Sequence, residues 1–144
     1  MKRLLIALTI ITATTFGFSP ANAVNEKPNI FVVVTSADAQ TQGMAMVLSI
    51  HARKQGAKVQ VLLCGPGGDL ALKGSPQTAL KPKGMTPQKL MAKLMTMDVY
   101  PQVCAIYLPN KGKSNADLIA GVSVAKPPAI ASAMLAAHTR FFTF

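Results

Sequence analysis

The feature that most limits the possible folds is an unbroken run of β-branched and aromatic residues, Ile-Phe-Val-Val-Val at positions 30–34. A strand with one face in water alternates apolar and polar residues, but this run has no polar position. It is therefore typical of a strand that is covered on both faces, as in a parallel sheet with helices on either side.

The rest of the chain alternates helical and extended patterns. Apolar residues at helical spacing predict a helix from 39 to about 55 that Gly56 ends, and Thr86-Pro87 supplies the N-cap and first residue of a second helix. Shorter helices are expected at 114–120 and 127–137, and further strands at 59–64, 103–108 and 139–144. The alternation predicts a three-layer α/β/α sandwich with a mostly parallel sheet, in a flavodoxin-like arrangement.

The first 23 residues are expected to lie outside this domain. A basic start is followed by an apolar run at 4–18 and then by Ala-Asn-Ala at 21–23, which is the order found in a cleaved secretory signal peptide. The alternative is a retained membrane anchor, but the run is shorter than the roughly 20 residues that a span needs. We expect cleavage after Ala23, and a mature domain of residues 24–144 that is periplasmic and not attached to a membrane.

The balance of charged residues limits the classes of function and of partner that we expect. The chain has 15 Lys and Arg against 5 Asp and Glu, a net charge of +10, and loss of Lys2 and Arg3 with the leader leaves +8. Chemistry that needs several carboxylates has few candidate residues. Nucleic acid is not an expected partner, because the basic residues are not interleaved with aromatic ones.

Ligands of open parallel sheets bind beyond the carboxyl ends of the strands. Three loops follow predicted strands, at 35–38, 65–69 and 109–113, and the glycines of the second allow close approach of backbone to an anion. That loop lacks the spacing of a dinucleotide or P-loop fingerprint. The candidate pocket residues are Ser36, Asp38, Gly65, Gly67, Gly68 and Asn110.

The two cysteines, Cys64 and Cys104, receive separate interpretations. A disulfide is the first possibility in an oxidising compartment. In a flavodoxin-like order, however, the first strand lies between the second and the third, so their cysteines stand about twice 4.8 Å apart, beyond the Cα limit of roughly 7 Å for a bridge. We therefore expect free thiols, with Cys64 in the core and Cys104 either in the core or available for chemistry.

No metal site and no cofactor are expected. His51 and His138 have no cysteine or carboxylate at ligand spacing. Methionines such as Met91 and Met95 are ligands that copper(I) prefers, but at helical spacing beside leucines they are better explained as core residues. A copper binder is the least favoured alternative.

Short motifs along the whole mature chain together resemble DsrE/DsrF-like proteins. They are the 30–38 strand and loop, Gly-Met-Ala at 43–45, Gly-Ala-Lys-Val at 56–59, Thr-Pro-Gln-Lys-Leu at 86–90, Val-Cys at 103–104, Asp-Leu-Ile at 117–119 and the phenylalanine-rich last strand. The resemblance implies a parallel sheet flanked by helices and a homo-oligomer, a trimer or hexamer.

The resemblance also implies sulfur-relay chemistry, in which a cysteine accepts sulfane sulfur as a persulfide and hands it to a partner thiol. Cys104 matches that cysteine, but Tyr107 stands where secreted relatives often have a second one, which implies a single-cysteine carrier with a sulfur donor or acceptor protein as partner. Lys111, Lys113 and a helix beginning near Ser114 would favour its thiolate. The competing hypothesis is a non-catalytic oligomeric module that binds a small ligand or anion in the same pocket.

Overall fold

The computed structural model describes residues 27–144, so the predicted signal peptide lies outside the described residues. In the described part, a five-stranded sheet has the order β4-β3-β2-β1-β5, and every neighbouring pair is parallel. Its strands are β1 (Asn29–Val34), β2 (Lys58–Leu63), β3 (Gln102–Val103), β4 (Ser123–Val124) and β5 (Thr139–Thr143). The predicted run at 30–34 is therefore an inner strand, with β2 on one side and β5 on the other.

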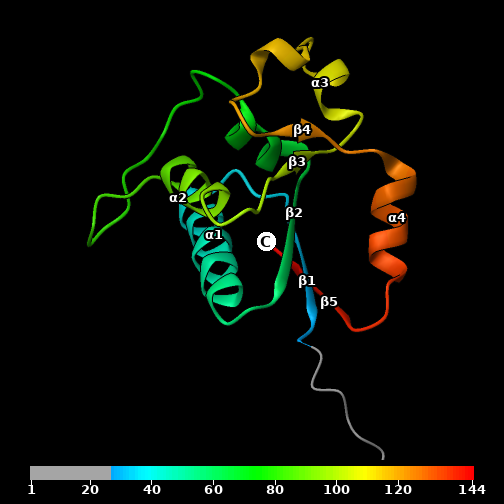
Figure 1. Ribbon diagram of the computed structural model, residues 1–144. Helices are drawn as coiled ribbons and strands as arrows, with labels where there is room; N and C mark the ends of the chain where they lie inside the picture. The colour runs from blue at the N-terminus through cyan, green and yellow to red at the C-terminus, as the bar shows by residue number, and fades with distance from the viewer. Residues whose placement is uncertain (1–26) are drawn as a thin grey trace, which may run out of the picture.

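Helices lie on both faces of the sheet, as predicted. Helices α1 (Ala39–Lys54) and α2 (Pro87–Met95) pack on one face and α4 (Pro127–Leu135) lies on the other (Figure 1). The local signals explain where two of them begin, because the Asp38 side chain accepts a hydrogen bond from the Thr41 amide and the Thr86 side chain accepts one from the Lys89 amide. The layered α/β architecture is confirmed.

The carboxyl end of the sheet carries three short helical segments. The 3₁₀ helix η1 (Gly65–Ala71) follows β2, the helix α3 (Tyr107–Asn110) follows β3 after a turn, and the 3₁₀ helix η2 (Asn115–Asp117) comes next along the chain. In Figure 1 they lie at the top of the molecule.

Among residues 27–144, no helix combines the length and the apolar character that a membrane crossing requires.

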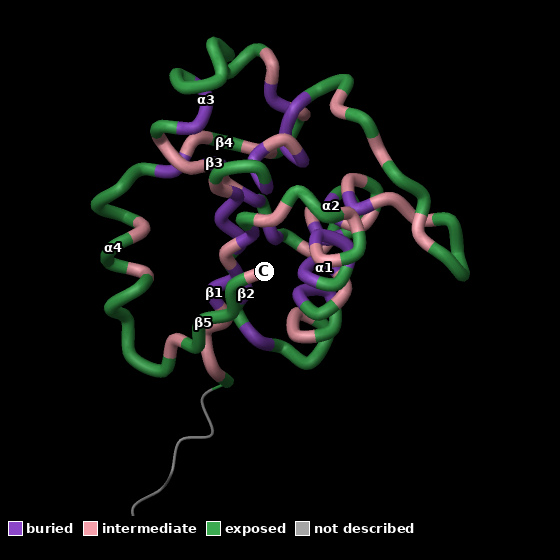
Figure 2. The backbone as a smooth tube through the Cα atoms, turned by 180° about the vertical axis from the view of Figure 1, so that it is seen from behind, coloured by how far each residue is buried: buried purple, intermediate pink, exposed green. Residues whose placement is uncertain are grey.

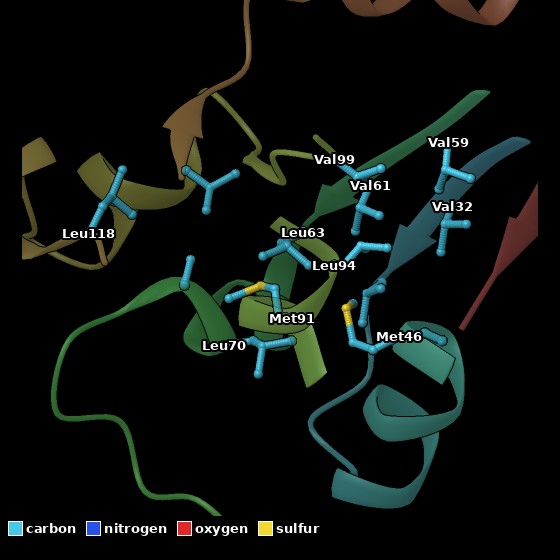
Figure 3. Close-up of a cluster of buried hydrophobic side chains, with 14 of the residues drawn as sticks. Val32, Met46, Val59, Val61, Leu63, Leu70, Met91, Leu94, Val99 and Leu118 are labelled. Atoms are coloured by element: carbon cyan, nitrogen blue, oxygen red, sulfur yellow. The ribbon is translucent and has the colours of Figure 1, made fainter. Parts of the chain in front are cut away.

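The core lies mainly between the sheet and the helices α1 and α2. Val34, Met46, Leu63, Met91 and Leu94 are fully buried there, and Figure 3 shows the last four of them. Met91 thus fills the core, as its helical spacing predicted, whereas Met95 is only partly buried. The opposite face has a much smaller cluster of buried residues, Phe31, Leu62 and Ala125, and α4 itself buries no residue (Figure 2).

The order of the strands differs from the flavodoxin-like order used to interpret the cysteines. The chain adds β2, β3 and β4 successively on one side of β1, and only β5 returns to the other side. Consequently β1 does not separate β2 from β3, and these two strands are hydrogen-bonded neighbours. The predicted strand at 103–108 is also shorter, because the Tyr107 amide donates to the Cys104 carbonyl and turns the chain into α3.

Candidate functional site

Cys64 and Cys104 form a disulfide, which corrects the expectation of two free thiols. Each cysteine directly follows a strand, and Leu63 of β2 is paired with Val103 of β3, so the next residue of each chain segment faces the other. Their Cα atoms are 5.2 Å apart, within the range of a bridge. The prediction failed because it placed β1 between two strands that are adjacent.

The disulfide lies in the wall of a depression of about 600 Å³, which we call the disulfide pocket. Both cysteines are partly exposed, so Cys64 does not lie in the core as predicted. The pocket is lined by Cys64, Gly65, Pro66, Asp69, Cys104, Ile106, Tyr107, Asn110 and Lys111. All of these come from η1, from α3 or from the residues just before or after them, so the pocket is built at the carboxyl ends of β2 and β3.

Three of these side chains form a polar cluster. The Tyr107 hydroxyl donates a hydrogen bond to the Asp69 carboxylate. The Lys111 Nζ lies 2.9 Å from the same carboxylate oxygen and 5.9 Å from the centre of the Tyr107 ring. Asp69 therefore holds a phenol and an ammonium group together beside the disulfide.

The cluster also sets the protonation of its members. Burial raises the pKa of Asp69, but hydrogen bonds from Tyr107 and Lys111 and the charge of Lys111 outweigh it, so the pKa lies below its usual value. Burial, followed by the hydrogen bond to Asp69, raises the pKa of Tyr107. At neutral pH the aspartate is ionised and the phenol keeps its proton.

The predicted pocket residues divide into three groups. Gly65 and Asn110 line the disulfide pocket together with Cys104. Ser36 and Asp38 do not line it: the Ser36 hydroxyl accepts from the Asp38 amide, and Asp38 caps α1 at the edge of a separate groove. Hydrogen bonds from the Thr41 amide and side chain outweigh a small opposing effect of desolvation and lower the pKa of Asp38, which fits a capping role.

Gly67 and Gly68 are buried and serve packing. A Cβ atom on Gly67 would collide with the Val34 carbonyl at the end of β1, and one on Gly68 would collide with the Tyr107 ring. The absence of side chains here lets η1 fold closely over the end of the sheet. These two glycines face protein atoms rather than an open space for an anion.

Of the groups expected to favour a thiolate, Lys111 is the one that lines the disulfide pocket. Lys113 forms an ion pair with Asp117 at 3.7 Å and lines a separate depression of about 440 Å³. Ser114 caps η2, a segment of three residues. Lys111 itself is paired with Asp69, so its charge is largely balanced within the pocket.

Sequence reasoning missed Asp69 and Tyr107 as parts of the site. Asp69 falls in the predicted loop at 65–69, and Tyr107 stands where the resemblance implies a cysteine. A signal was present, because each lies a few residues beyond a cysteine that ends a predicted strand, and neighbouring parallel strands end at the same edge of a sheet.

Within residues 27–144, no cluster of three or more His, Cys, Asp or Glu residues is placed to hold a metal ion.

No protein-family model and no curated protein matches this chain. Among solved structures, the chain is similar to the YchN protein of E. coli, with 23% identity and a TM-score of 0.67 over 81% of this chain and 99% of that chain. It is also similar to MTH1491, a protein of unknown function from Methanobacterium thermoautotrophicum, with 13% identity and a TM-score of 0.57 over 83% of this chain and 100% of that chain. The three proteins share a fold.

Proposed function

We propose that this chain is a DsrE/DsrF-like sulfur-relay protein in which Cys104 carries sulfane sulfur as a persulfide. The observation that carries the proposal is the position of Cys104, which is partly exposed in a pocket at the carboxyl end of the sheet and bonded to a second cysteine. The shared fold with YchN supports it. The order of the motifs along the chain, which resembles that of DsrE/DsrF-like proteins, supports it as well.

The proposed cycle starts when a dithiol reductant opens the disulfide and leaves as its own cyclic disulfide. The Cys104 thiolate then attacks the outer sulfur of a persulfide donor, the donor's S–S bond breaks, and the donor leaves as a thiolate. A partner thiolate next attacks the outer sulfur of the Cys104 persulfide and takes it, which restores the Cys104 thiolate.

The neighbouring cysteine adds a second fate for the persulfide. The Cys64 thiolate attacks the inner sulfur of the persulfide, hydrosulfide leaves, and the disulfide forms again. This step replaces the expected single-cysteine carrier by a carrier with a resolving cysteine, Cys64, which follows β2 and does not lie at the position of Tyr107. The disulfide is then the resting, oxidised state of the pair.

Mass spectrometry of the reduced protein after exposure to polysulfide tests the proposal. We expect the peptide containing Cys104 to gain the mass of one sulfur atom, and Cys104→Ser to abolish this gain. Cys64→Ser is the matched variant, in which the persulfide is expected to last longer because no thiol resolves it. If Cys104 gains no sulfur in the Cys64→Ser variant, where nothing competes for it, the proposal is wrong.

We also propose that the mature protein works in the periplasm. Disulfides persist in oxidising compartments and are rare in reducing ones, so the Cys64–Cys104 bond supports this location. Together with the leader-like start of the chain, it favours export followed by cleavage after Ala23. The intact mass of the protein from a periplasmic fraction is expected to correspond to a chain that starts at Val24. A chain with its first 23 residues retained would contradict the proposal.

A homo-oligomer is proposed as well, formed through α4 and β5. The sequence of α4 contains no charged residue, yet none of its residues is buried, and Leu135 at its end is 87% exposed. β5 is an edge strand with two exposed phenylalanines, Phe141 and Phe142, and such edges favour pairing with another chain. In a strongly basic protein, the uncharged surface of α4 is where two copies meet with the least repulsion.

Light scattering after size-exclusion chromatography tests the oligomer. We expect a multiple of the monomer mass for the wild type and a shift toward the monomer for Leu135→Lys combined with Phe141→Lys, since Phe141 lies opposite Phe31 on the face of the sheet that α4 covers. Leu48→Lys is the control, because Leu48 is an exposed leucine of α1 on the other face of the sheet. A monomeric wild type, or equal effects of both changes, would contradict this interface.

A further inference from the structure

The disulfide and a set of side-chain contacts both link η1 to α3. Cys64 directly precedes η1 and Cys104 lies three residues before α3, so the disulfide joins the two segments near their starts. Further along, Asp69 of η1 contacts Tyr107 at the start of α3 and Lys111 just after its end. We call Asp69, Tyr107 and Lys111 the clamp.

The clamp is well anchored and contains no sulfur. Tyr107 is 5% exposed, and its ring lies against Gly68 so closely that no larger residue fits there. The Tyr107 amide donates to the Cys104 carbonyl at 2.9 Å, and the Lys111 amide donates to the Tyr107 carbonyl at 3.1 Å. Opening the disulfide breaks none of these contacts.

The strand that precedes Cys104 is short, and so is its outer neighbour β4, which has two residues. β3 has two residues, and its ladder with β2 consists of the pairs Leu62–Gln102 and Leu63–Val103. The cysteines are 40 positions apart in sequence, so the chain between them does not keep them close by itself. The Cys104 amide donates to the Leu63 carbonyl at 2.9 Å, which extends this short ladder by one bond, and the clamp adds contacts between the segments that follow the two cysteines.

We propose that the clamp holds the Cys64 and Cys104 thiols in bonding position in the reduced protein and balances charge at the thiolate. The inference rests on the proposed function in one respect: it assumes that Cys64 and Cys104 cycle between dithiol and disulfide. In the cycle, a thiolate of a dithiol reductant attacks one sulfur of the bond and the other sulfur leaves as a thiolate. The second reductant sulfur then closes its own disulfide, and the protein keeps two thiols after taking up protons.

Two physical effects follow from the arrangement. The ease of closing the disulfide depends on the effective concentration of the two thiols, which falls when the segments that carry them separate. The thiol pKa depends on nearby charge, and here Asp69 and Lys111 oppose each other. Tyr107 affects only the effective concentration of the two thiols, because its phenol stays neutral. Asp69 and Lys111 affect both that concentration and the thiol pKa.

The first test is the redox equilibrium of the folded protein with reduced and oxidised dithiothreitol, with the oxidised fraction measured by thiol labelling and mass spectrometry. Tyr107→Phe keeps the ring against Gly68 and removes only the hydroxyl. We expect its equilibrium constant for disulfide formation to fall by roughly tenfold, equivalent to about 1.4 kcal/mol. Tyr100→Phe is the matched control, since Tyr100 is exposed and lies outside the pocket, and we expect no change.

The second test is the pH profile of iodoacetamide alkylation at Cys104, in a Cys64→Ser background so that one thiol reports. Asp69→Asn leaves the Lys111 charge unbalanced and is expected to lower the midpoint, while Lys111→Gln is expected to raise it, each by roughly half a unit. A merely structural role of these residues would not shift the midpoint in opposite directions. Circular dichroism establishes that each variant is folded.

Three outcomes would overturn the inference. They are equal redox constants for Tyr107→Phe and Tyr100→Phe, alkylation midpoints that do not move in opposite directions, and a disulfide that dithiothreitol opens only in denaturant. Neither test uses a sulfur donor. A protein that fails to take up sulfane sulfur therefore contradicts the proposed function and leaves the test of the clamp intact.

Discussion

Opening the Cys64–Cys104 bond is expected to lower the free energy of unfolding substantially. The bond closes a loop of 40 residues, and cross-linking a loop removes entropy from the unfolded chain. For a loop of that length, the chain-entropy relation gives about 13 cal/mol/K, or about 4 kcal/mol at 25 °C. In a domain of this size, such a loss lowers the melting temperature by roughly 15 °C.

Urea unfolding followed by far-ultraviolet circular dichroism measures this loss, because the chain has no tryptophan to report by fluorescence. The wild type is compared with and without reductant, and Cys64→Ala combined with Cys104→Ala is the control, in which reductant should change nothing. The expected difference for the wild type is about 4 kcal/mol in the unfolding free energy. A difference below roughly 1 kcal/mol, or an equal effect of reductant on the double variant, would refute the loop-entropy reasoning.

Three further predictions concern packing, acid stability and capping. Gly68→Ala drives a Cβ atom into the Tyr107 ring and should lower the free energy of unfolding in urea by about 1–3 kcal/mol. The control is Gly74→Ala, whose Cβ meets open space and which should cost only about 1 kcal/mol for its positive φ. Equal losses for the two variants would mean that the ring contact is unimportant. Because the pKa of Asp69 is lowered on folding, its ionised form stabilises the protein above the usual carboxyl pKa of 3.8 and this contribution is lost as pH falls through the lower folded value. Acid titration of the unfolding free energy should therefore be less steep for Asp69→Asn than for the wild type, with a residual slope from other carboxylates, and unchanged steepness would contradict the assignment. Thr86→Ala removes the N-cap of α2 and should lower the free energy of unfolding in urea by about 1 kcal/mol. The control is Thr78→Ala, at an exposed loop position, which should cause no measurable loss. Equal effects of the two changes would show that the cap is not stabilising.

Local features of the fold were predictable from the sequence because they depend on adjacent residues. The run at 30–34, the N-cap of α2 and the helical spacing around Met91 each led to the element that the structure has. The strand order was not predictable in this way. It depends on which side of β1 each later strand joins, and no local pattern encodes that choice.

The candidate site was predictable only in part for the same reason. Gly65, Cys104 and Asn110 follow adjacent strands and line one pocket. Ser36 and Asp38 follow β1, where the Thr35 and Ser36 amides both donate to the Phe144 carbonyl. Phe144 thus covers the loop after β1. The part of the carboxyl end of the sheet that stays open lies beyond β2 and β3.

The position of β5 has a consequence for how the domain folds. β5 pairs with β1, so that Asn29 lies opposite Thr139 across more than a hundred residues of intervening chain. Contacts so distant in sequence close the largest loop in the domain, and they make folding slower than the local α1 and β2 contacts would alone. A nascent chain that has not yet reached Thr139 would expose one side of its inner strand, with the aggregation hazard that an unpaired strand edge brings.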